Sequence, residues 1–458
     1  MKNPILFLFT IICFSCAEKK QPEKMVNESS PSTVTLMTLD PGHFHAALVH
    51  KKMYPQVDST IHIYAPEGPE VQDFLNKIEQ YNNRPDNPTA WTVETELGEG
   101  FAGDMLSRKP GNVMIVAGKN SKKIDYILEA VKAGLNVYAD KPLVINGEGF
   151  EKLKVAFQVA EENDVLIYDI MTERFESTTV LQKLFSTVPG VFGELMDGSP
   201  DRPAITKESV HHFFKYVSGK PLVRPTWFFD VDEEGDGIVD VTTHLVDLVQ
   251  WEAFPDVIID TTAIEMLSAK RWPTVLTPKE FQQVTGSETY PEYLQKDLDG
   301  DNLKVFSNGQ MIYKINGKHA KVSVIWNYQA PEGTGDTHYS IMRGTKSDLI
   351  IKQGAEEDYK PVLYIESHTE EPLEPAIQEA IGNEVAKKYP GTSFEKVSDK
   401  VFKILVPDKF KIGHEAHFGQ VTENYLGYLE AGKLPGWEVP NMISKYYTTV
   451  KAYETAME

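Results

Sequence analysis

Three residues of this chain have the types and the spacing needed for acid–base chemistry on a hydroxyl group. Asp240 and His244 are four positions apart, so on a helix they share one face and the carboxylate can orient the imidazole. A histidine suits this work because its unperturbed pKa lies near neutrality. Lys141 follows a short apolar run, where partial burial would lower its pKa and let it join a proton relay. We therefore expect these three residues to be catalytic, beside a cofactor that takes the hydride.

Other polar and aromatic side chains could line a substrate cleft. His212 and Lys215 precede an aromatic run that contains Trp227, and aromatic faces with charged groups suit a sugar ring. Aromatic residues near strand ends are also typical of a buried core, so both roles stay open. Arg174 follows the last apolar run of the first half and either faces the substrate or pins a domain junction. The candidate substrate-binding residues are Lys141, Arg174, His212, Lys215, Trp227 and His244.

Two further groups have spacings that resemble metal sites, and both are incomplete. His414 and His417 begin a C-terminal helical pattern but lack an obvious third ligand, which favours a capping or interface role. The acidic tract 230–236 resembles a calcium loop, yet it lacks the glutamate expected at the twelfth position. We expect no metal site.

Strands that alternate with helices must position these residues. Short apolar runs predict strands at 33–39, 60–65, 113–117, 136–139 and 165–170. Apolar residues at helical spacing predict helices at 121–133 and 147–163. This alternation predicts a doubly wound parallel sheet, in which ligands bind beyond the carboxyl ends of the strands.

The loop after the first strand would hold the pyrophosphate of a dinucleotide. Its sequence is Asp40-Pro41-Gly42-His43-Phe44-His45, so only the middle glycine of the G-x-G-x-x-G fingerprint is present, and His45 replaces the last one. Glu67 lies beyond the second strand. It either binds the adenosine ribose, which would favour NAD over NADP, or is a solvated carboxylate in a turn.

Two segments resemble the Gfo/Idh/MocA oxidoreductase family. In Val113–Val144, a strand leads through Gly118-Lys119-Asn120 and a helix to Asp140-Lys141-Pro142, where the family has Glu-Lys-Pro. Asp236–Asp247 resembles the family's glycine-rich approach to a D-x-x-x-H helix. The resemblance covers residues 33–250. Taken singly, each motif is also typical of a surface turn or an exposed ion pair; together and in this order they favour the family.

The resemblance implies an α/β fold with an NAD-binding Rossmann domain at 33–171. A substrate-binding α/β domain with a large, mostly antiparallel open sheet would follow at 172–458. It implies that Lys141, Asp240 and His244 face a sugar or glycoside, and that NAD, with NADP less favoured, is the cofactor. Family members commonly dimerise through the open sheet, so a homo-oligomer is an open alternative. The candidate cofactor-binding residues are Gly42, His43, His45, Glu67, Ala117, Gly118, Asn120, Asp140 and Lys141.

Turn signals support the antiparallel second sheet independently. Asn308-Gly309 and Asn316-Gly317 separate strand-like runs within 303–326, and Asn-Gly between such runs is a strong hairpin signal. The segment 338–351, broken at 343–346, adds further strands.

The N-terminal segment predicts export. Residues 1–16 read as a signal peptide that ends at Cys16, which resembles the lipidated cysteine of a bacterial lipobox, although Cys13 stands where leucine is usual. Residues 17–32 are polar and read as a tether. We expect a periplasmic or outer-membrane lipoprotein that touches the membrane through its lipid alone; a plain secreted protein is the alternative.

The net charge and the cysteine content disfavour several kinds of partner and exclude several kinds of site. The 458 residues carry a formal net charge of −21, which disfavours nucleic acid and anionic lipid as partners. No cysteine follows Cys16, which excludes a redox CxxC pair, a zinc ribbon and a cysteine nucleophile.

Three functions fit these observations. The first is oxidation of a sugar or glycoside to its keto form by a tightly bound cofactor, because an exported enzyme meets little free NAD and must reoxidise NADH in place. The second is glycoside cleavage through oxidation, elimination and reduction on NAD. The third is a non-catalytic lipoprotein that binds sugars or partners, which the incomplete glycine fingerprint supports.

Overall fold

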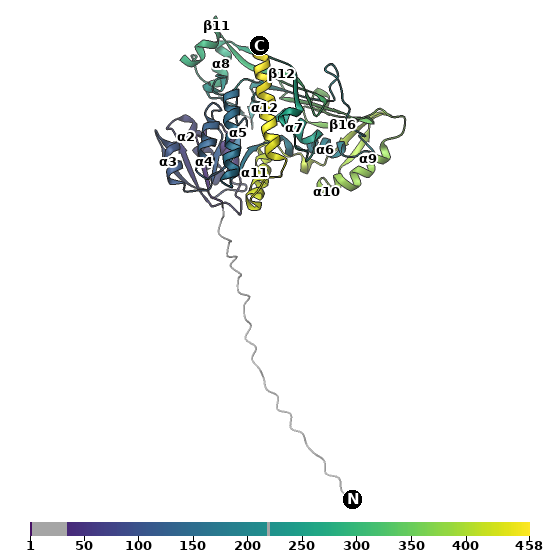
Figure 1. The fold of residues 1–458 in the computed structure, drawn as a ribbon, viewed down its shortest axis with the longest axis horizontal. Helices are drawn as coiled ribbons and strands as arrows, with labels where there is room; N and C mark the ends of the chain where they lie inside the picture. Colours follow the sequence, from purple (N-terminus) through teal and green to yellow (C-terminus); the bar gives the residue numbers. More distant parts are fainter. Residues whose placement is uncertain (2–33, 218–219) are drawn as a thin grey trace.

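The computed structural model describes residues 1, 34–217 and 220–458 (Figure 1). The strands of the first sheet are β1 (Leu36–Leu39), β2 (Thr60–Ala65), β3 (Thr92–Leu97), β4 (Val113–Val116), β5 (Asn136–Asp140) and β6 (Ile167–Ile170). They pair in parallel in the order β3-β2-β1-β4-β5-β6, the order of dinucleotide-binding folds. Five of these strands confirm the apolar runs. β3 was not anticipated, because it is an edge strand whose residues are largely exposed.

Helices cover both faces of this sheet. They are α1 (His45–Val49), α2 (Pro69–Asn83), α3 (Phe101–Arg108), α4 (Lys123–Lys132) and α5 (Gly147–Glu162). α4 and α5 confirm the two predicted helices, and Asn146 caps α5 by accepting a hydrogen bond from the Gly149 amide. α1 is only five residues long and entirely buried.

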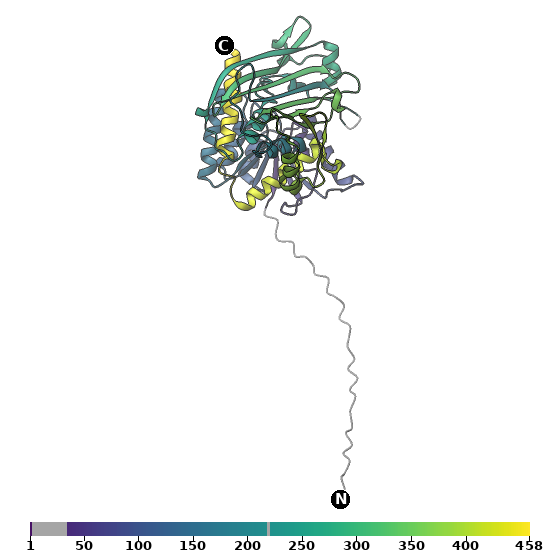
Figure 2. The same cartoon turned by 90° about the vertical axis from the view of Figure 1, so that its right-hand side faces the viewer.

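The second sheet is ten-stranded and lies over the rest of the molecule as a curved layer (Figure 2). Its order is β10-β12-β13-β7-β14-β15-β16-β18-β17, with β11 on β12. Only the β13–β7 pair is parallel, which confirms the mostly antiparallel sheet. The strands are β7 (Ile205–Phe214), β10 (Ile264–Leu276), β11 (Leu298–Asp299), β12 (Asn302–Ile315), β13 (Lys318–Gln329), β14 (Thr337–Arg343), β15 (Ser347–Lys352), β16 (Val362–Ser367), β17 (Ser393–Lys396) and β18 (Val401–Leu405), besides a small pair β8 (Tyr216–Val217) and β9 (Lys220–Pro221).

One of the two Asn-Gly signals is a hairpin and the other is not. Asn316-Gly317 turns between β12 and β13 as predicted. Asn308 instead lies inside β12, where its side chain donates to the Trp272 carbonyl and accepts from the Trp326 amide. The amide side chain thus bridges three strands at a register shift between β10 and β12, so the predicted turn at Asn308-Gly309 is wrong.

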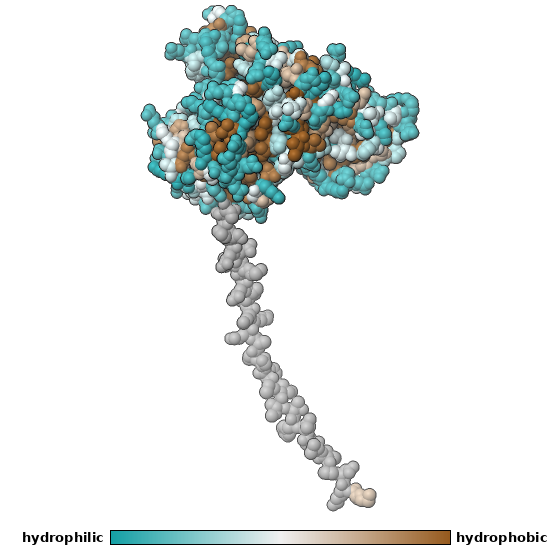
Figure 3. Space-filling model, in the orientation of Figure 1, coloured by the Kyte–Doolittle hydropathy of each residue, from teal (hydrophilic) through white to brown (hydrophobic). Residues whose placement is uncertain are grey.

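The remaining α-helices follow the first sheet in the chain. They are α6 (Ser177–Ser186), α7 (Thr242–Ala253), α8 (Pro278–Thr285), α9 (Glu374–Ala380), α10 (Ala386–Lys388), α11 (His414–Ala431) and α12 (Glu438–Met457). α11 packs on the first sheet, where the Tyr425 ring stacks on Tyr138 of β5 and on Tyr168 of β6, with centroids 4.6 and 5.8 Å away. α12 runs beside α5, where Phe150 meets Tyr447, and apolar residues gather along these two helices (Figure 3).

The last two helices therefore complete the first domain. Phe418, Val421 and Tyr425 of α11 belong to the core beneath β1, and Met442 and Tyr446 of α12 belong to the core on the other face. Residues 172–458 thus supply two helices to the cores on the two faces of the first sheet.

Cys16 and the proposed tether at 17–32 lie outside the described residues. In the part of the chain that is described, none of the helices is both long and apolar enough to cross a membrane.

Buried His50 and half-buried His338 predict acid sensitivity of the fold. Burial lowers the pKa of both histidines to about 3, against 6.5 for an unperturbed histidine. Below pH 6.5 the unfolded chain therefore binds more protons than the folded one, and the free energy of unfolding falls by up to about 1.4 kcal/mol per pH unit for each histidine. Urea unfolding at pH 7 and pH 5 measures this fall. His50→Asn should make it smaller, whereas the surface variant His319→Gln should not.

Candidate active site

The centre of the site is the turn that follows β5. The Lys141 ammonium forms an ion pair with the Asp240 carboxylate, and both side chains are about nine-tenths buried. Lys123 holds this turn from below, because its buried ammonium donates to the carbonyls of Asp140, at 2.8 Å, and Pro142, at 3.1 Å. The backbone at Lys141 is thus fixed where ligands of a parallel sheet bind.

Lys141 is held as a cation. Burial lowers its pKa, but Asp240 and Asp140 outweigh burial, and the pKa lies above its ordinary value. The expectation that burial would lower this pKa is therefore wrong, since the carboxylates enter the same buried space. Lys141 can donate a hydrogen bond and stabilise a developing negative charge, but it cannot serve as a base near neutral pH.

Asp240 does not orient His244. It precedes α7, which begins at Thr242, so the two residues do not share a helical face and the carboxylate contacts Lys141 instead. The Nδ1 atom of His244 is buried without a hydrogen-bond partner. Burial, followed by the charge of Lys141, lowers the His244 pKa well below 6.5. The imidazole is consequently neutral at pH 7 and able to accept a proton.

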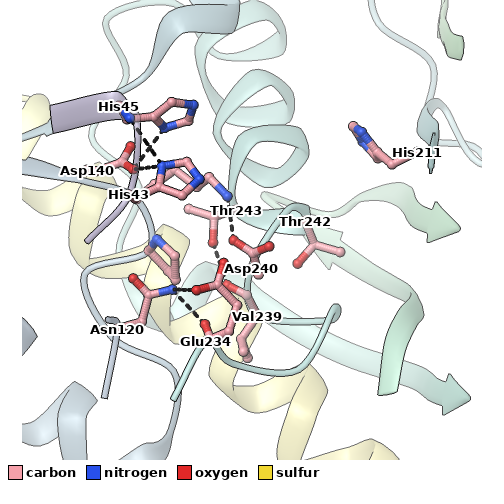
Figure 4. Close-up of polar contacts among 12 residues, drawn as sticks. His43, His45, Asn120, Asp140, His211, Glu234, Val239, Asp240, Thr242 and Thr243 are labelled. Carbon is pink, nitrogen blue, oxygen red and sulfur yellow. Dashed lines mark hydrogen bonds and ion pairs between the residues drawn. The ribbon is translucent and has the colours of Figure 1, made fainter. Parts of the chain in front are cut away.

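Glu234 is a fourth titratable group in the site, and the sequence did not predict it. The Asn120 amide donates to the Glu234 carbonyl at 2.6 Å and to its carboxylate at 3.2 Å (Figure 4). Burial, then the charge of Asp240, raises the Glu234 pKa well above its ordinary value. The acidic tract 230–236 was the only sequence signal at this position, and its resemblance to a calcium loop pointed elsewhere. Asn120, expected to touch the cofactor, is occupied with Glu234 and Lys123.

His43 and His45 face Asp140. The Nδ1 atom of His45 lies 2.9 Å from the Asp140 carboxylate and that of His43 lies 3.5 Å from the same oxygen (Figure 4). The two imidazoles meet edge to face, with centroids 4.1 Å apart. Their side chains therefore point to the end of β5, so their expected role as pyrophosphate ligands has no support from these contacts.

A small pocket lies where a nucleotide is expected, at the carboxyl ends of β1 and β2. Asp40 closes the tight turn with φ of 47°, in the left-handed region that a glycine of the fingerprint would adopt freely. Gly118 is needed beside it, because a Cβ there would lie 2.4 Å from the Asp40 carbonyl oxygen. Glu67 is exposed, and Glu70 lines the pocket in its place. The lining residues are Asp40, Pro41, Gly42, Ala65, Pro66, Glu70, Val71, Lys119 and Trp227.

These residues fit the ribose–phosphate part of a dinucleotide. The Trp227 indole lies against Gly42, and its buried N–H has no hydrogen-bond partner, so an acceptor such as a phosphate oxygen would satisfy it. Lys119 supplies a positive charge and Glu70 a carboxylate for ribose hydroxyls. The cavity of about 60 Å³ admits such a fragment only, so the rest of a dinucleotide would lie along the strand ends. Trp227, expected at the substrate, thus lies at the nucleotide pocket.

Residues expected to bind substrate gather around Asp336. Its carboxylate lies 3.0 Å from His212 Nδ1, 2.6 Å from the Lys215 ammonium and 3.4 Å from His211 Nδ1. These partners outweigh burial and hold the Asp336 pKa below its ordinary range. Burial lowers the His211 pKa, although Asp336 acts to raise it. The sequence did not single out Asp336, since its pairing depends on the sheet.

Arg174 pins the domain junction. Its guanidinium donates twice to Asp247, at 2.7 Å, and twice to Glu438 of α12, at 2.8 and 3.0 Å. Lys445 and Asp169 extend the buried network. With its donors occupied, Arg174 takes the second of the two roles left open, and its expected contact with substrate is not supported.

The comparisons with known proteins agree with this geometry. The family model "Putative oxidoreductase C terminal domain" matches residues 181–457, more than half of the chain. A crystal structure of a "putative oxidoreductase" from Parabacteroides merdae ATCC 43184 is 52% identical, with a TM-score of 0.91, and the match covers 94% of this chain and 98% of that one. The chain belongs to this oxidoreductase family. Among curated proteins, none matches it.

More distant solved structures share the fold. Levoglucosan dehydrogenase in complex with NADH and levoglucosan is 13% identical, with a TM-score of 0.58, over 92% of this chain and 97% of that one. GenD2 from gentamicin A biosynthesis, in complex with NAD, is 12% identical, with a TM-score of 0.55, over 93% and 95%. At this level of identity, the likeness shows that the oxidoreductase shares their fold.

Proposed function

We propose that this oxidoreductase uses a nicotinamide cofactor to oxidise a hydroxyl group of a sugar or glycoside to a ketone. The observation that carries the proposal is the buried ion pair of Lys141 with Asp240, together with a buried His244 Nδ1 that has no hydrogen-bond partner, at the carboxyl edge of a Rossmann-type sheet. Removing a hydride from a carbinol carbon also requires a proton acceptor for its oxygen, and a donor that stabilises negative charge on that oxygen. His244 and Lys141 match these needs.

Each group has one role. His244 accepts the hydroxyl proton, Lys141 donates a hydrogen bond to the same oxygen, and Asp240 keeps the ammonium charged and in place. Gly42, Glu70, Lys119 and Trp227 would hold a nicotinamide dinucleotide, which supplies the hydride-accepting chemistry when bound. NAD is favoured over NADP because Glu70 would repel a 2′-phosphate.

The class of substrate is supported by two observations. The polar cluster His211, His212, Lys215 and Asp336 offers donors and an acceptor, which suits a polyhydroxylated ring. Structures with the same fold are complexes of levoglucosan dehydrogenase with levoglucosan and with L-sorbose. We extend the proposal to an exported lipoprotein attached through Cys16, to a retained, tightly bound cofactor and to assembly as a homo-oligomer.

Native mass spectrometry of the mature protein tests the cofactor first. We expect stoichiometric NAD or NADH to be released on denaturation, and absorbance in the reduced-nicotinamide band to rise when a reactive sugar is added. A protein that contains no nicotinamide and binds neither NAD nor NADP would contradict the proposal and favour a sugar-binding protein without catalysis.

Glu234 favours a second candidate, glycoside cleavage through oxidation, elimination and reduction. Elimination needs an acid in addition to the residues that carry out oxidation. Burial raises the pKa of the Glu234 carboxyl well above its ordinary value, which favours the protonated form. Release of the aglycone from an aryl glycoside, with no net NADH formed, would support this reaction. An unchanged glycosidic bond beside a new keto group would support oxidation alone.

His244→Asn should lower kcat by roughly 10²- to 10⁴-fold, because it removes the proton acceptor and keeps the size of the side chain. In the unmodified protein, the lowered pKa of His244 places the acid limb of kcat/KM below pH 6.5, since the base stays unprotonated down to its folded pKa. A pH profile of both proteins measures these effects. An acid limb at or above pH 6.5 would rule out His244 as the base.

A further inference from the structure

His43, His45 and Asp140 together form an arrangement that the proposed oxidation does not use. His43 lies in the loop after β1, His45 begins α1 and Asp140 ends β5, yet one ligand atom from each lies within 4.8 Å of the other two. The Asp140 oxygen is 2.9 Å from His45 Nδ1 and 3.5 Å from His43 Nδ1. Two imidazole nitrogens thus converge on one carboxylate at the floor of the active site.

These separations match the ligand spacing of a small divalent ion. Zinc binds histidine nitrogen and carboxylate oxygen at roughly 2.0–2.2 Å, so neighbouring ligands of a tetrahedral site lie ~3.4 Å apart. The observed 2.9 and 3.5 Å lie on either side of this value. The Nδ1 atom of His43 also accepts a hydrogen bond from the His45 backbone N–H at 3.4 Å, so this nitrogen carries a lone pair, as a metal ligand must.

A second observation points to a ligand at this position. The Asp140 side chain is 6% exposed, and its other oxygen, Oδ1, is buried without a hydrogen-bond partner. An orphaned carboxylate oxygen in a dry site is costly unless a cation or donor satisfies it. The chain also carries a histidine where the dinucleotide fingerprint has its last glycine, and this imidazole is the one nearest to Asp140.

We propose that His43, His45 and Asp140 bind a divalent transition-metal ion, with Zn²⁺ or Co²⁺ favoured by two imidazoles and one carboxylate. Three protein ligands leave a coordination position open, as in catalytic zinc sites. The site adjoins Lys141 through the Asp140–Lys141 peptide bond, so an ion here would lie beside the substrate oxygen and could polarise it. This inference replaces the expectation of no metal, and it holds whether or not the chain oxidises a sugar.

Metal titration of the full-length protein tests this inference without any assay of activity. After chelator treatment and dialysis, Co²⁺ should bind at one equivalent with visible d–d absorption, and Zn²⁺ should compete for it. His43→Gln, His45→Gln and Asp140→Asn should each weaken Co²⁺ binding by more than about tenfold, a loss that even an outer partner of a metal ligand produces.

Two controls separate binding at this site from binding elsewhere on the protein. His62→Gln removes a histidine that is paired with Glu94 on the edge of the first sheet and should leave Co²⁺ binding unchanged. Zn²⁺ should raise the unfolding temperature of the parent protein and of His62→Gln, but not that of His43→Gln, whose side chain is partly exposed. Co²⁺ binding well below one equivalent, or equal binding by parent and His43→Gln, would overturn the inference and leave an ordinary hydrogen-bonded pair.

Discussion

Lys141→Met should lower kcat by roughly 10²- to 10³-fold, the loss expected when one preorganised donor to a developing oxyanion is removed. Methionine keeps the length and the apolar stem of lysine, so the substitution removes the ammonium group and little else. The ion pair with Asp240 keeps this ammonium charged in the unmodified protein. Steady-state kinetics with an oxidised sugar, followed by the absorbance of reduced nicotinamide, measures the loss.

Two further variants separate the role of the charge from damage to the fold. Lys141→Met leaves the Asp240 carboxylate buried and unpaired, so we would combine it with Asp240→Asn, which should restore stability but not kcat. Lys132→Met removes an exposed lysine, paired only with Glu129, and should leave kcat unchanged. If Lys141→Met retains more than about a tenth of the parent kcat, the ammonium does not stabilise the reacting oxygen.

Arg174→Met should lower the free energy of unfolding by about 3–5 kcal/mol. The substitution leaves the carboxylates of Asp247 and Glu438 facing each other in a buried junction with only Lys445 in reach. Urea or thermal unfolding at pH 7 measures the change, and the surface variant Arg202→Met should be neutral.

A triple variant tests the cause of that loss. Adding Asp247→Asn and Glu438→Gln to Arg174→Met removes the uncompensated charges and should recover much of the stability, since buried ion networks can often be replaced with little net cost. Destabilisation of the triple variant equal to that of Arg174→Met alone would mean that packing of the guanidinium, and not charge, holds the junction.

The sequence was most informative where burial is continuous. Strands covered on both faces are unbroken apolar runs, and they located β1, β2, β4, β5 and β6 within a few residues. β3 has one exposed face and an exposed edge, so its polar alternation gave no comparable signal. Asn308-Gly309 was misassigned because a side chain that bridges three strands has the same local sequence as a turn.

The site was predictable as a set of residues but not as a set of contacts. Lys141, Asp240 and His244 come together at one end of the first sheet, yet helical spacing wrongly paired Asp240 with His244, because the helix begins two residues after Asp240. The positions of His43, His45 and Asp336 depend on which strand ends meet. These contacts join segments that are far apart in the sequence, so local sequence patterns do not predict them.

The packing of α11 and α12 has a consequence for how the chain is made. Their apolar side chains complete both faces of the first sheet, so the N-terminal domain cannot close its cores until the last residues have left the ribosome. Both cores of the first sheet therefore stay incomplete until the C-terminal helices have been made, which delays maturation of the chain. A chain that ends before α11 would expose the apolar faces of the first sheet and be prone to aggregation.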